Sequence, residues 1–227
     1  MKYLVKLLML AILVSACNTK QDPKEEKPTL EPEMALDSTV AEKQVNYKAI
    51  DSDEALVATA LMAAPAESRE GCKVIGFNMA GEFVTFREGS NEFIVITDDP
   101  SKPGFNAACY HQDLEPFMAR GRELRAQGKS GGEIFDIREA EAKSGQLDMG
   151  RPGSTLHIYY GSKANYEPET YKVEDAIYRY VVYLPFATSE STGLPEVPIS
   201  PDHPWIMNPG THRAHIMISP KPETQDF

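Results

Sequence analysis

The densest group of reactive side chains in this sequence lies between residues 109 and 115. Cys109, His111, Asp113 and Glu115 place a thiol, an imidazole and two carboxylates within a few residues of one another. A thiolate near an imidazole and a helix N-terminus can have a lowered pKa and act as a nucleophile. One hypothesis is therefore a thiol- or carboxylate-dependent hydrolase that uses Cys109, His111 and Glu115.

The same residues also have a structural interpretation. Asp113 is a good N-cap, and Glu115 falls in a first turn, where the helix dipole favours negative charge. Pro116 fits the same turn because its missing N–H costs no hydrogen bond there. A functional Cys/His pair is usually assembled from distant segments, whereas Cys109 and His111 are two positions apart. The sequence therefore favours a capped structural helix over residues 113–127.

Three arginines gather on this predicted helix. Arg120, Arg122 and Arg125 form a local basic cluster on an acidic chain. They could hold an anionic ligand or pair with the domain's own carboxylates, and the 34 acidic residues of the chain favour the second alternative. On the apolar face, Gly121 costs the helix about 1 kcal/mol relative to Ala. Its missing Cβ therefore predicts the close approach of another element.

A long segment near the C-terminus is the second candidate binding element. Residues 187–212 are rich in Pro, Ser and Thr, and a loop of about 25 residues is well above the usual 4–6. Ordered long loops often carry function, so we expect this segment and the arginine helix to form a binding surface. The candidate binding residues are Arg120, Arg122, Arg125, His203, Trp205 and His212.

The sequence predicts no metal site and no cofactor. A metal site needs three or four converging ligands, and His212 and His215 would point to opposite faces of a predicted strand. The chain contains no phosphate-binding loop, no dinucleotide fingerprint, and no H-E-x-x-H, G-x-S-x-G or CxxC motif. These absences leave it undecided whether the chain is an enzyme.

The N-terminus has the pattern of an export signal. Lys2 and Lys6 precede the unbroken apolar run 7–14, and small residues precede Cys17. Residues 1–16 are therefore a predicted signal peptide, shorter in its apolar part than the roughly 20 residues that span a bilayer. The sequence V-S-A-C resembles the lipobox of bacterial lipoproteins, at which acyl chains such as palmitate are attached to the cysteine. The resemblance implies lipidation of Cys17 and a place in a bacterial cell envelope. The outer membrane is the expected site, with the domain facing the periplasm or the surface.

A tether is predicted over residues 17–47. Residues 18–44 are dominated by Lys, Glu and Pro and contain no aromatic residue. Such a stretch cannot bury enough apolar area to offset its ordering entropy, and coil scaling gives it a span of roughly 30 Å. Its acidic residues and lysines resemble the surface-export region of lipoproteins in the Bacteroidetes group.

The net charge limits the classes of partner that the chain can bind. The formal net charge is −11 and no basic stripe is present, so the sequence excludes nucleic acid as an expected partner. The expected partners are the membrane, through the N-terminal lipid, and an envelope protein or a small ligand.

Cys72 and Cys109 are a disulfide candidate because disulfides persist in exported proteins. The bridge would close a loop of about 38 residues and contribute about 4 kcal/mol.

Residues 48–227 are predicted to form a single α+β domain. The expected helices cover 53–64, 113–127 and 131–144, the last with Ser130 and Glu133 as a capping box and Gly145 as the C-cap. The expected strands cover 72–78, 82–87 and 92–97 as a β-meander, followed by 155–160, 176–186 and 214–218. Helices and strands come in blocks, which favours a mainly antiparallel sheet with about three helices.

Several stretches together resemble a group of exported bacterial proteins. They are residues 61–66 (LMAAPA), 86–91 (FREGSN), 109–128 and 184–195. The resemblance covers most of residues 55–220 and implies a single exported domain, but the group has no assigned activity. The favoured role is a lipid-anchored binding or interaction module, with the hydrolase as the alternative.

Overall fold

The computed structural model describes residues 45–221, which belong to one compact unit of the chain. The predicted signal peptide, Cys17 and residues 17–44 of the predicted tether lie outside the described residues. The helices are α1 (Asp53–Ala60), α2 (Glu115–Ala126), α3 (Gly131–Lys143) and α4 (Ser189–Thr192), with the 3-10 helices η1 (Leu61–Ala63), η2 (Ala66–Gly71) and η3 (Gln112–Leu114). The strands are β1 (Lys48–Ala49), β2 (Lys73–Phe77), β3 (Phe83–Arg87), β4 (Phe93–Ile96), β5 (Phe105–His111), β6 (Thr155–Gly161), β7 (Asn165–Tyr166), β8 (Ile177–Tyr183), β9 (Trp205–Met207) and β10 (His215–Ile218).

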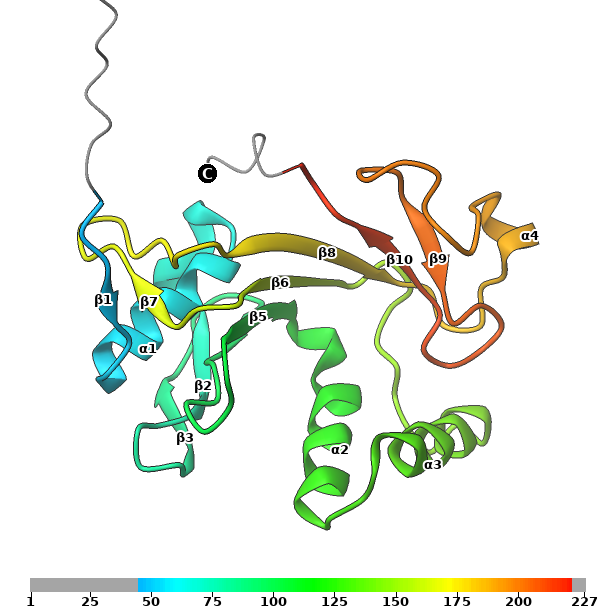
Figure 1. Cartoon of the computed structure of the whole chain (residues 1–227). Helices are drawn as coiled ribbons and strands as arrows, with labels where there is room; N and C mark the ends of the chain where they lie inside the picture. The colour runs from blue at the N-terminus through cyan, green and yellow to red at the C-terminus, as the bar shows by residue number, and fades with distance from the viewer. Residues whose placement is uncertain (1–44, 222–227) are drawn as a thin grey trace, which may run out of the picture. The chain divides into compact units, whose positions relative to one another are not determined.

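One large sheet organises these elements (Figure 1). Its eight strands lie in the order β3-β2-β4-β5-β6-β8-β10-β9, while β1 and β7 form a separate two-stranded sheet. Within the large sheet, β2 and β4 are parallel and the other neighbours are antiparallel. The prediction of an α+β fold with a mainly antiparallel sheet is confirmed.

The first three strands of the large sheet differ from the expected meander. Strand β4 pairs with β2 rather than with β3, so β2 lies between them. The connection from β3 to β4 therefore crosses the start of β2. Gly89 permits this crossing, because a Cβ at this position would lie 2.5 Å from the Lys73 backbone nitrogen. The backbone N–H groups of Ser90 and Asn91 then donate to the Gly71 carbonyl.

Strand β5 was not among the predicted elements, although it pairs with β4 and β6 inside the sheet. Phe105, Ala107 and Cys109 are buried on one face, and Tyr110 is buried on the other. The strand contains no β-branched residue, so its sequence carries a weak strand signal.

The start of α2 corrects the predicted cap. The ring nitrogen Nδ1 of His111 accepts the Asp113 backbone N–H at 3.2 Å and caps η3. The Asp113 carboxylate instead pairs with Arg151, so the assignment of Asp113 as the N-cap is wrong. Glu115 and Pro116 do occupy the first turn of α2, as predicted.

Helix α3 has the predicted ends. The Ser130 hydroxyl accepts the Glu133 backbone N–H at 3.3 Å, and the Glu133 carboxylate accepts the Ser130 backbone N–H at 2.9 Å. These Ser130 contacts lower the pKa of Glu133 to about 2. Gly145 follows the helix with φ of 75°, the left-handed conformation of a helix C-cap.

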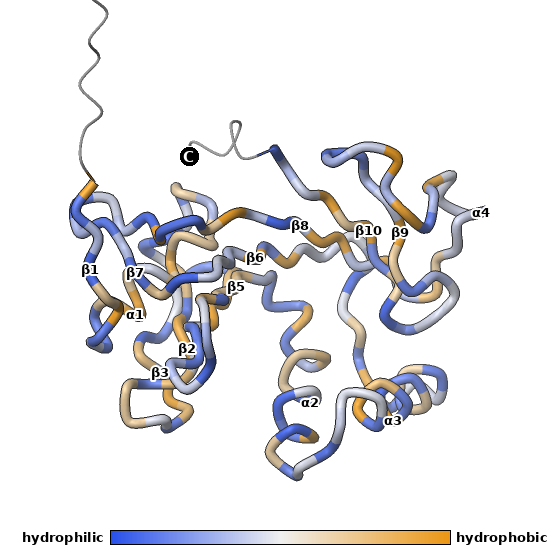
Figure 2. Tube along the Cα trace, in the orientation of Figure 1, coloured by the Kyte–Doolittle hydropathy of each residue, from blue (hydrophilic) through white to orange (hydrophobic). Residues whose placement is uncertain are grey.

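The sheet separates two hydrophobic cores. On one face, Val74, Val95, Cys109 and Tyr178 pack with Met62 of η1. On the other face, the residues that pack with Phe117 of α2 are Ile75, Ile94, Tyr110, Leu114, Val181, Tyr183 and Met217. In Figure 2, α2 and α3 alternate between hydrophobic and hydrophilic residues, as expected of helices with one covered face. Within residues 45–221, no helix has both the length and the apolar character needed to cross a bilayer.

The long segment 187–212 is tied to the domain. It contains α4 and the edge strand β9, in which Trp205 pairs with Met217 of β10. The Ile206 backbone N–H also donates to the Pro195 carbonyl at 2.9 Å. The segment is therefore an extension of the sheet edge rather than a free loop.

Candidate functional site

A pocket lies on the face of the sheet that η1 and η2 cover. Its volume is about 530 Å³, within the range of small-molecule sites. The lining residues are Met62, Ala63, Ala64, Pro65, Ala66, Glu67, Arg69, His157, Tyr178 and Tyr180. The pocket thus has one wall from the 3-10 helices and one from β6 and β8.

The sheet wall is aromatic. His157 of β6 and Tyr180 of β8 are cross-strand partners, and their ring centroids lie 5.0 Å apart in an edge-to-face arrangement. The Tyr178 ring is 6.2 Å from that of Tyr180 and 4.6 Å from that of Tyr159, and each pair is within 21° of parallel. Such a row of rings offers a platform on which a planar group can stack.

The opposite wall consists of small residues. Helix η1 ends at Ala63, Ala64 is extended (φ −85°, ψ 151°), and Pro65 leads into η2. The residue before a proline is pushed out of the helical region, which explains why the helix ends there. Ala63, Ala64, Pro65 and Ala66 carry few side-chain atoms, so they leave space in front of the aromatic rings.

Two side chains hold the walls in place. The Tyr178 hydroxyl donates to the Met62 carbonyl at 3.0 Å. Arg69 donates from Nε to the Ala64 carbonyl at 3.1 Å and from Nη2 to the Met62 carbonyl at 3.4 Å. A guanidinium has five N–H groups, so three N–H groups of Arg69 have no hydrogen bond to any residue in 45–221. Arg69 forms no ion pair with any of the described residues.

Burial sets the charges in the pocket. It lowers the pKa of His157 below its usual range, against the opposing effect of a hydrogen bond to the Ala63 backbone. It also raises the pKa of Tyr178 and Tyr180. At neutral pH these three side chains are uncharged. The charged groups of the lining are then the half-buried Arg69 and the exposed Glu67.

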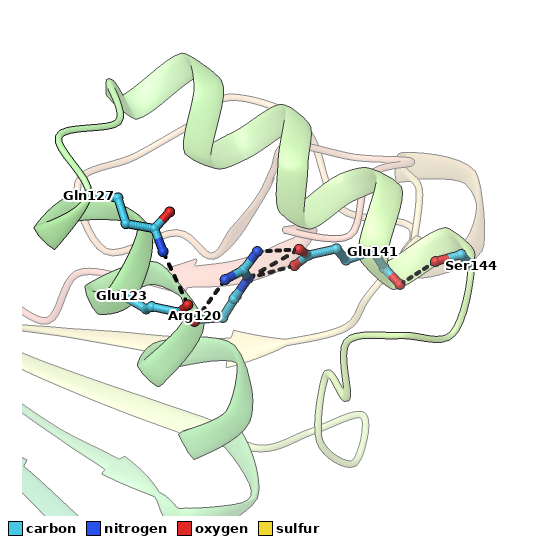
Figure 3. A network of polar contacts seen from close by, with 5 residues as sticks. All are labelled: Arg120, Glu123, Gln127, Glu141 and Ser144. Atoms are coloured by element: carbon cyan, nitrogen blue, oxygen red, sulfur yellow. Dashed lines mark hydrogen bonds and ion pairs between the residues drawn. The ribbon is translucent and has the colours of Figure 1, made fainter.

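Arg120, from the predicted binding surface, is occupied by carboxylates of the domain (Figure 3). Its Nε donates to both Glu141 oxygens at 3.0 and 3.1 Å, and its Nη2 donates at 2.6 Å. Its Nη1 donates to Glu123 at 2.7 Å. The hydrogen bonds to Glu141 and Glu123 raise the pKa of Arg120. This arrangement joins α2 to α3.

Arg122 also binds groups of the domain, whereas the Arg125 side chain has no hydrogen bond or ion pair with the residues that the structure describes. Arg122 donates to Glu115 at 2.5 Å and to the Tyr110 hydroxyl at 3.2 Å. Arg125 is exposed on α2. For Arg120 and Arg122 the structure therefore favours pairing with the domain's own carboxylates, the alternative that the sequence also favoured.

His212 is fully buried and belongs to the packing of α3. Its Nδ1 lies 2.5 Å from the Glu139 carboxylate, which also accepts the His212 backbone N–H at 2.7 Å. Its ring packs edge-to-face against Phe117 and Phe135 at centroid distances of 5.9 and 4.8 Å. This predicted binding residue is therefore inaccessible to a ligand and anchors the end of the long segment.

Gly121 meets the close neighbour that the sequence predicted. The Arg138 guanidinium lies 4.0 Å from the centroid of the Phe117 ring, and its Nη1 donates to the Phe117 carbonyl at 3.2 Å. A Cβ on Gly121 would be 3.0 Å from that Nη1. Burial lowers the pKa of Arg138 to about 10.

Trp205 and His203 lie at the sheet edge. Trp205 is half-buried and packs against the core that α2 covers. Among the described residues, no hydrogen bond, ion pair or ring contact joins Trp205 or His203 to Arg120 or Arg122. The six predicted binding residues are thus spread over α2, the sheet edge and the interior, and none of them lines the pocket.

The residues of the alternative hydrolase lie on two faces of the sheet. Cys109 is buried in the core on the pocket side, whereas Glu115 accepts the Tyr110 hydroxyl at 2.5 Å on the other side. Interaction with the Cys72 thiol and burial both raise the pKa of Cys109. A nucleophilic cysteine needs a lowered pKa and access to substrate, so this geometry gives the hydrolase hypothesis little support.

Cys72 and Cys109 are both buried thiols. Their side chains interact with each other, and the Cys72 thiol donates to the Ser68 carbonyl at 3.1 Å. The pair that the sequence proposed as a disulfide candidate is therefore adjacent in the fold. Within residues 45–221, no group of three or more His, Cys, Asp and Glu side chains could hold a metal ion.

The pocket residues were missed as a site by sequence reasoning. Two signals were present: three alanines next to Pro65 after a helix, and two tyrosines at alternate positions of a predicted strand. Neither signal shows that the two segments face each other, because they are about 110 positions apart. Comparisons with known protein families, with curated proteins and with solved structures found no match to this chain.

Proposed function

We propose that this chain is a lipid-anchored protein of the bacterial cell envelope whose domain binds a small ligand. The signal sequence ending at Cys17 and the tether of residues 17–47 support the anchor and an outer-membrane location. The pocket between the 3-10 helices and the aromatic wall supports the binding role. This role is the interaction module favoured by the sequence, with its site moved to the other face of the sheet.

The observation that carries the proposal is the rigid construction of the pocket. Tyr178 of β8 donates a hydrogen bond to the Met62 carbonyl of the opposite wall. Arg69 of η2 donates to the Met62 and Ala64 carbonyls and so fixes the 3-10 helix wall itself. The two walls are therefore held in position without a ligand. A preformed pocket reduces the ordering cost of binding. Protein interiors are otherwise close-packed and leave few voids. A pocket whose walls are fixed by specific hydrogen bonds therefore differs from a packing defect.

The test is a small-molecule screen on the full-length protein in detergent, read by thermal unfolding. Ala66 lines the pocket and is exposed, so Ala66→Trp fills the pocket without disturbing the core. Ala80 is exposed in the β2–β3 turn and is not a lining residue, so Ala80→Trp is the matched control. We expect ligands that stabilise the wild type and Ala80→Trp but not Ala66→Trp. If no stabilising compound loses its effect in Ala66→Trp, the proposal is wrong.

A further inference from the structure

We propose that the pocket binds a planar aromatic carboxylate, with its carboxylate on Arg69 and its ring against Tyr180 and His157. The inference rests on the proposed function and names its ligand class.

Arg69 is suited to hold an anion. Its guanidinium is fixed by the Met62 and Ala64 carbonyls, and within the described part of the chain three of its N–H groups have no acceptor. The planar, fork-shaped guanidinium matches a carboxylate. Arg69 is half-buried, and a charge of this kind attracts an anion more strongly than an exposed one because less water screens it.

Glu67 is the opposing charge of the lining. Its side chain is exposed, so water and salt screen it more than they screen Arg69. The chain as a whole is acidic, with a formal net charge of −11. The attraction to Arg69 must therefore act at short range, inside the pocket.

The aromatic wall is suited to hold a flat ring. Tyr159, Tyr178 and Tyr180 form a nearly parallel row in which Tyr180 is the last ring. The facing wall of small residues leaves room for a further ring beside it. Since burial keeps His157 neutral, its ring neither attracts nor repels the anion. The Tyr180 hydroxyl forms no hydrogen bond with the described residues, so it can donate one to the ligand.

Four probes of one size separate charge from ring character. Benzoate, benzamide and benzamidinium are an anion, a neutral molecule and a cation of the same shape, and cyclohexanecarboxylate keeps the charge but loses the flat ring. Binding to the full-length protein is measured by ligand-observed NMR at one fixed ionic strength. Ala66→Trp provides the baseline for partition into detergent. For probes this small we expect dissociation constants on the order of 1 mM for benzoate.

We expect benzoate to have the highest affinity. The affinity of benzamide should be at least about tenfold lower, and that of benzamidinium lower still. The affinity of cyclohexanecarboxylate should be several-fold lower than that of benzoate. Arg69→Met removes the preference for benzoate over benzamide, and Arg69→Lys restores part of it. Arg151→Met is the control, because Arg151 is an exposed cation that is not a lining residue. The wild-type ranking tests the inference even if Arg69→Met fails to fold.

Three other results overturn the inference, each in a distinct way. If benzamide binds as well as benzoate, Arg69 does not select an anion. If benzamidinium binds best, Glu67 is the anchor and the sign of the ligand is wrong. If none of the probes binds above the Ala66→Trp baseline, the ligand class is wrong. In all three cases the proposed function survives if the compound screen still gives ligands that Ala66→Trp excludes, and it fails if the screen gives none.

Discussion

At the scale of single residues, the contact between Gly121 and Arg138 explains a glycine that helix propensity disfavours. The buried guanidinium of Arg138 occupies the space that a side chain on Gly121 would need. The Arg138 guanidinium lies over the Phe117 ring and donates one hydrogen bond to the Phe117 carbonyl. Its Nε has no hydrogen-bond partner among the described residues. Gly121 therefore lowers the intrinsic stability of α2, but it leaves the space in which Arg138 of α3 packs against α2.

The first prediction concerns this contact. Gly121→Ala should gain less stability in the wild type than in an Arg138→Met background, with a difference of about 1 kcal/mol. The reason is that the new Cβ displaces Arg138 only when Arg138 is present. Gly132, an exposed helical glycine with no neighbouring atom at its Cβ position, is the control and should show no such coupling. Urea unfolding of the wild type, the two single variants and the double variant measures this coupling, and additive effects would contradict the account.

The second prediction concerns Cys72 and Cys109. Because their thiols interact in the folded domain, we expect a mild disulfide oxidant to join them. The bridge should raise the free energy of unfolding by about 4 kcal/mol over the reduced protein. Alkylation under denaturing conditions, followed by mass spectrometry, counts the thiols before and after oxidation. Two unprotected thiols after oxidation would rule out the bridge.

At the scale of elements, the sequence was informative where the signal is local. The caps of α3 follow from Ser130, Glu133 and Gly145, whose chemistry depends only on neighbouring residues. The fold class follows from the grouping of helices and strands. Strand β5 was missed because its small residues carry little strand preference, although it is buried between two neighbours.

Long-range pairing explains the remaining differences. The parallel pairing of β2 with β4 depends on the crossing at Gly89, which the hydrophobic pattern does not reveal. The pocket depends on the packing of η1 and η2 against β6 and β8, far away in sequence. The sequence pointed to Arg120 and Arg122 rather than to the pocket residues for the same reason: the two arginines are conspicuous in the sequence, but their carboxylate partners are set by the tertiary fold.

The third prediction concerns pH and the packing of β6, β10 and α3. Burial lowers the pKa of His157, His212 and His215 in the folded state. Below their unfolded pKa of about 6.5 the unfolded chain binds more protons, so stability is complete above this pH and is lost as the pH falls. The loss is at most about 1.4 kcal/mol per pH unit for each histidine.

Urea unfolding at about pH 7.5 and about pH 5.5 measures this loss. Despite burial, hydrogen bonds from Lys143 and His212 lower the pKa of Glu139 to about 2. Its contribution is therefore lost only below the unfolded pKa of about 4.5, outside this window. His212→Gln should reduce the pH dependence by about one third, the share of one histidine in three. An unchanged pH dependence in this variant would contradict the assignment.

At the scale of the whole molecule, the two faces of the sheet are covered in different ways. The face under α2 and α3 is filled by packed side chains and internal ion pairs, including Arg120–Glu141 and His212–Glu139. The face under η1 and η2 retains a pocket. We infer that the first face stabilises the domain and the second carries its function.

The fourth prediction concerns the anchor. In a bacterial host, the full-length protein should incorporate an alkyne analogue of palmitate and remain with the membrane fraction. Cys17→Ala should abolish both properties because the acceptor thiol is lost, while Cys72→Ala, which removes another cysteine, should retain them. Labelling of Cys17→Ala at the wild-type level would show that the lipobox resemblance is misleading.

The central claim is that the pocket beside Ala66 is a ligand site. Its most direct test is the unfolding temperature of the wild type, Ala66→Trp and Ala80→Trp with a stabilising compound at about 100 times its dissociation constant. The compound should add about 2.7 kcal/mol to the free energy of unfolding, or about 5 to 10 °C, in the wild type and in Ala80→Trp. We expect no shift in Ala66→Trp, and an equal shift in all three proteins would contradict the account.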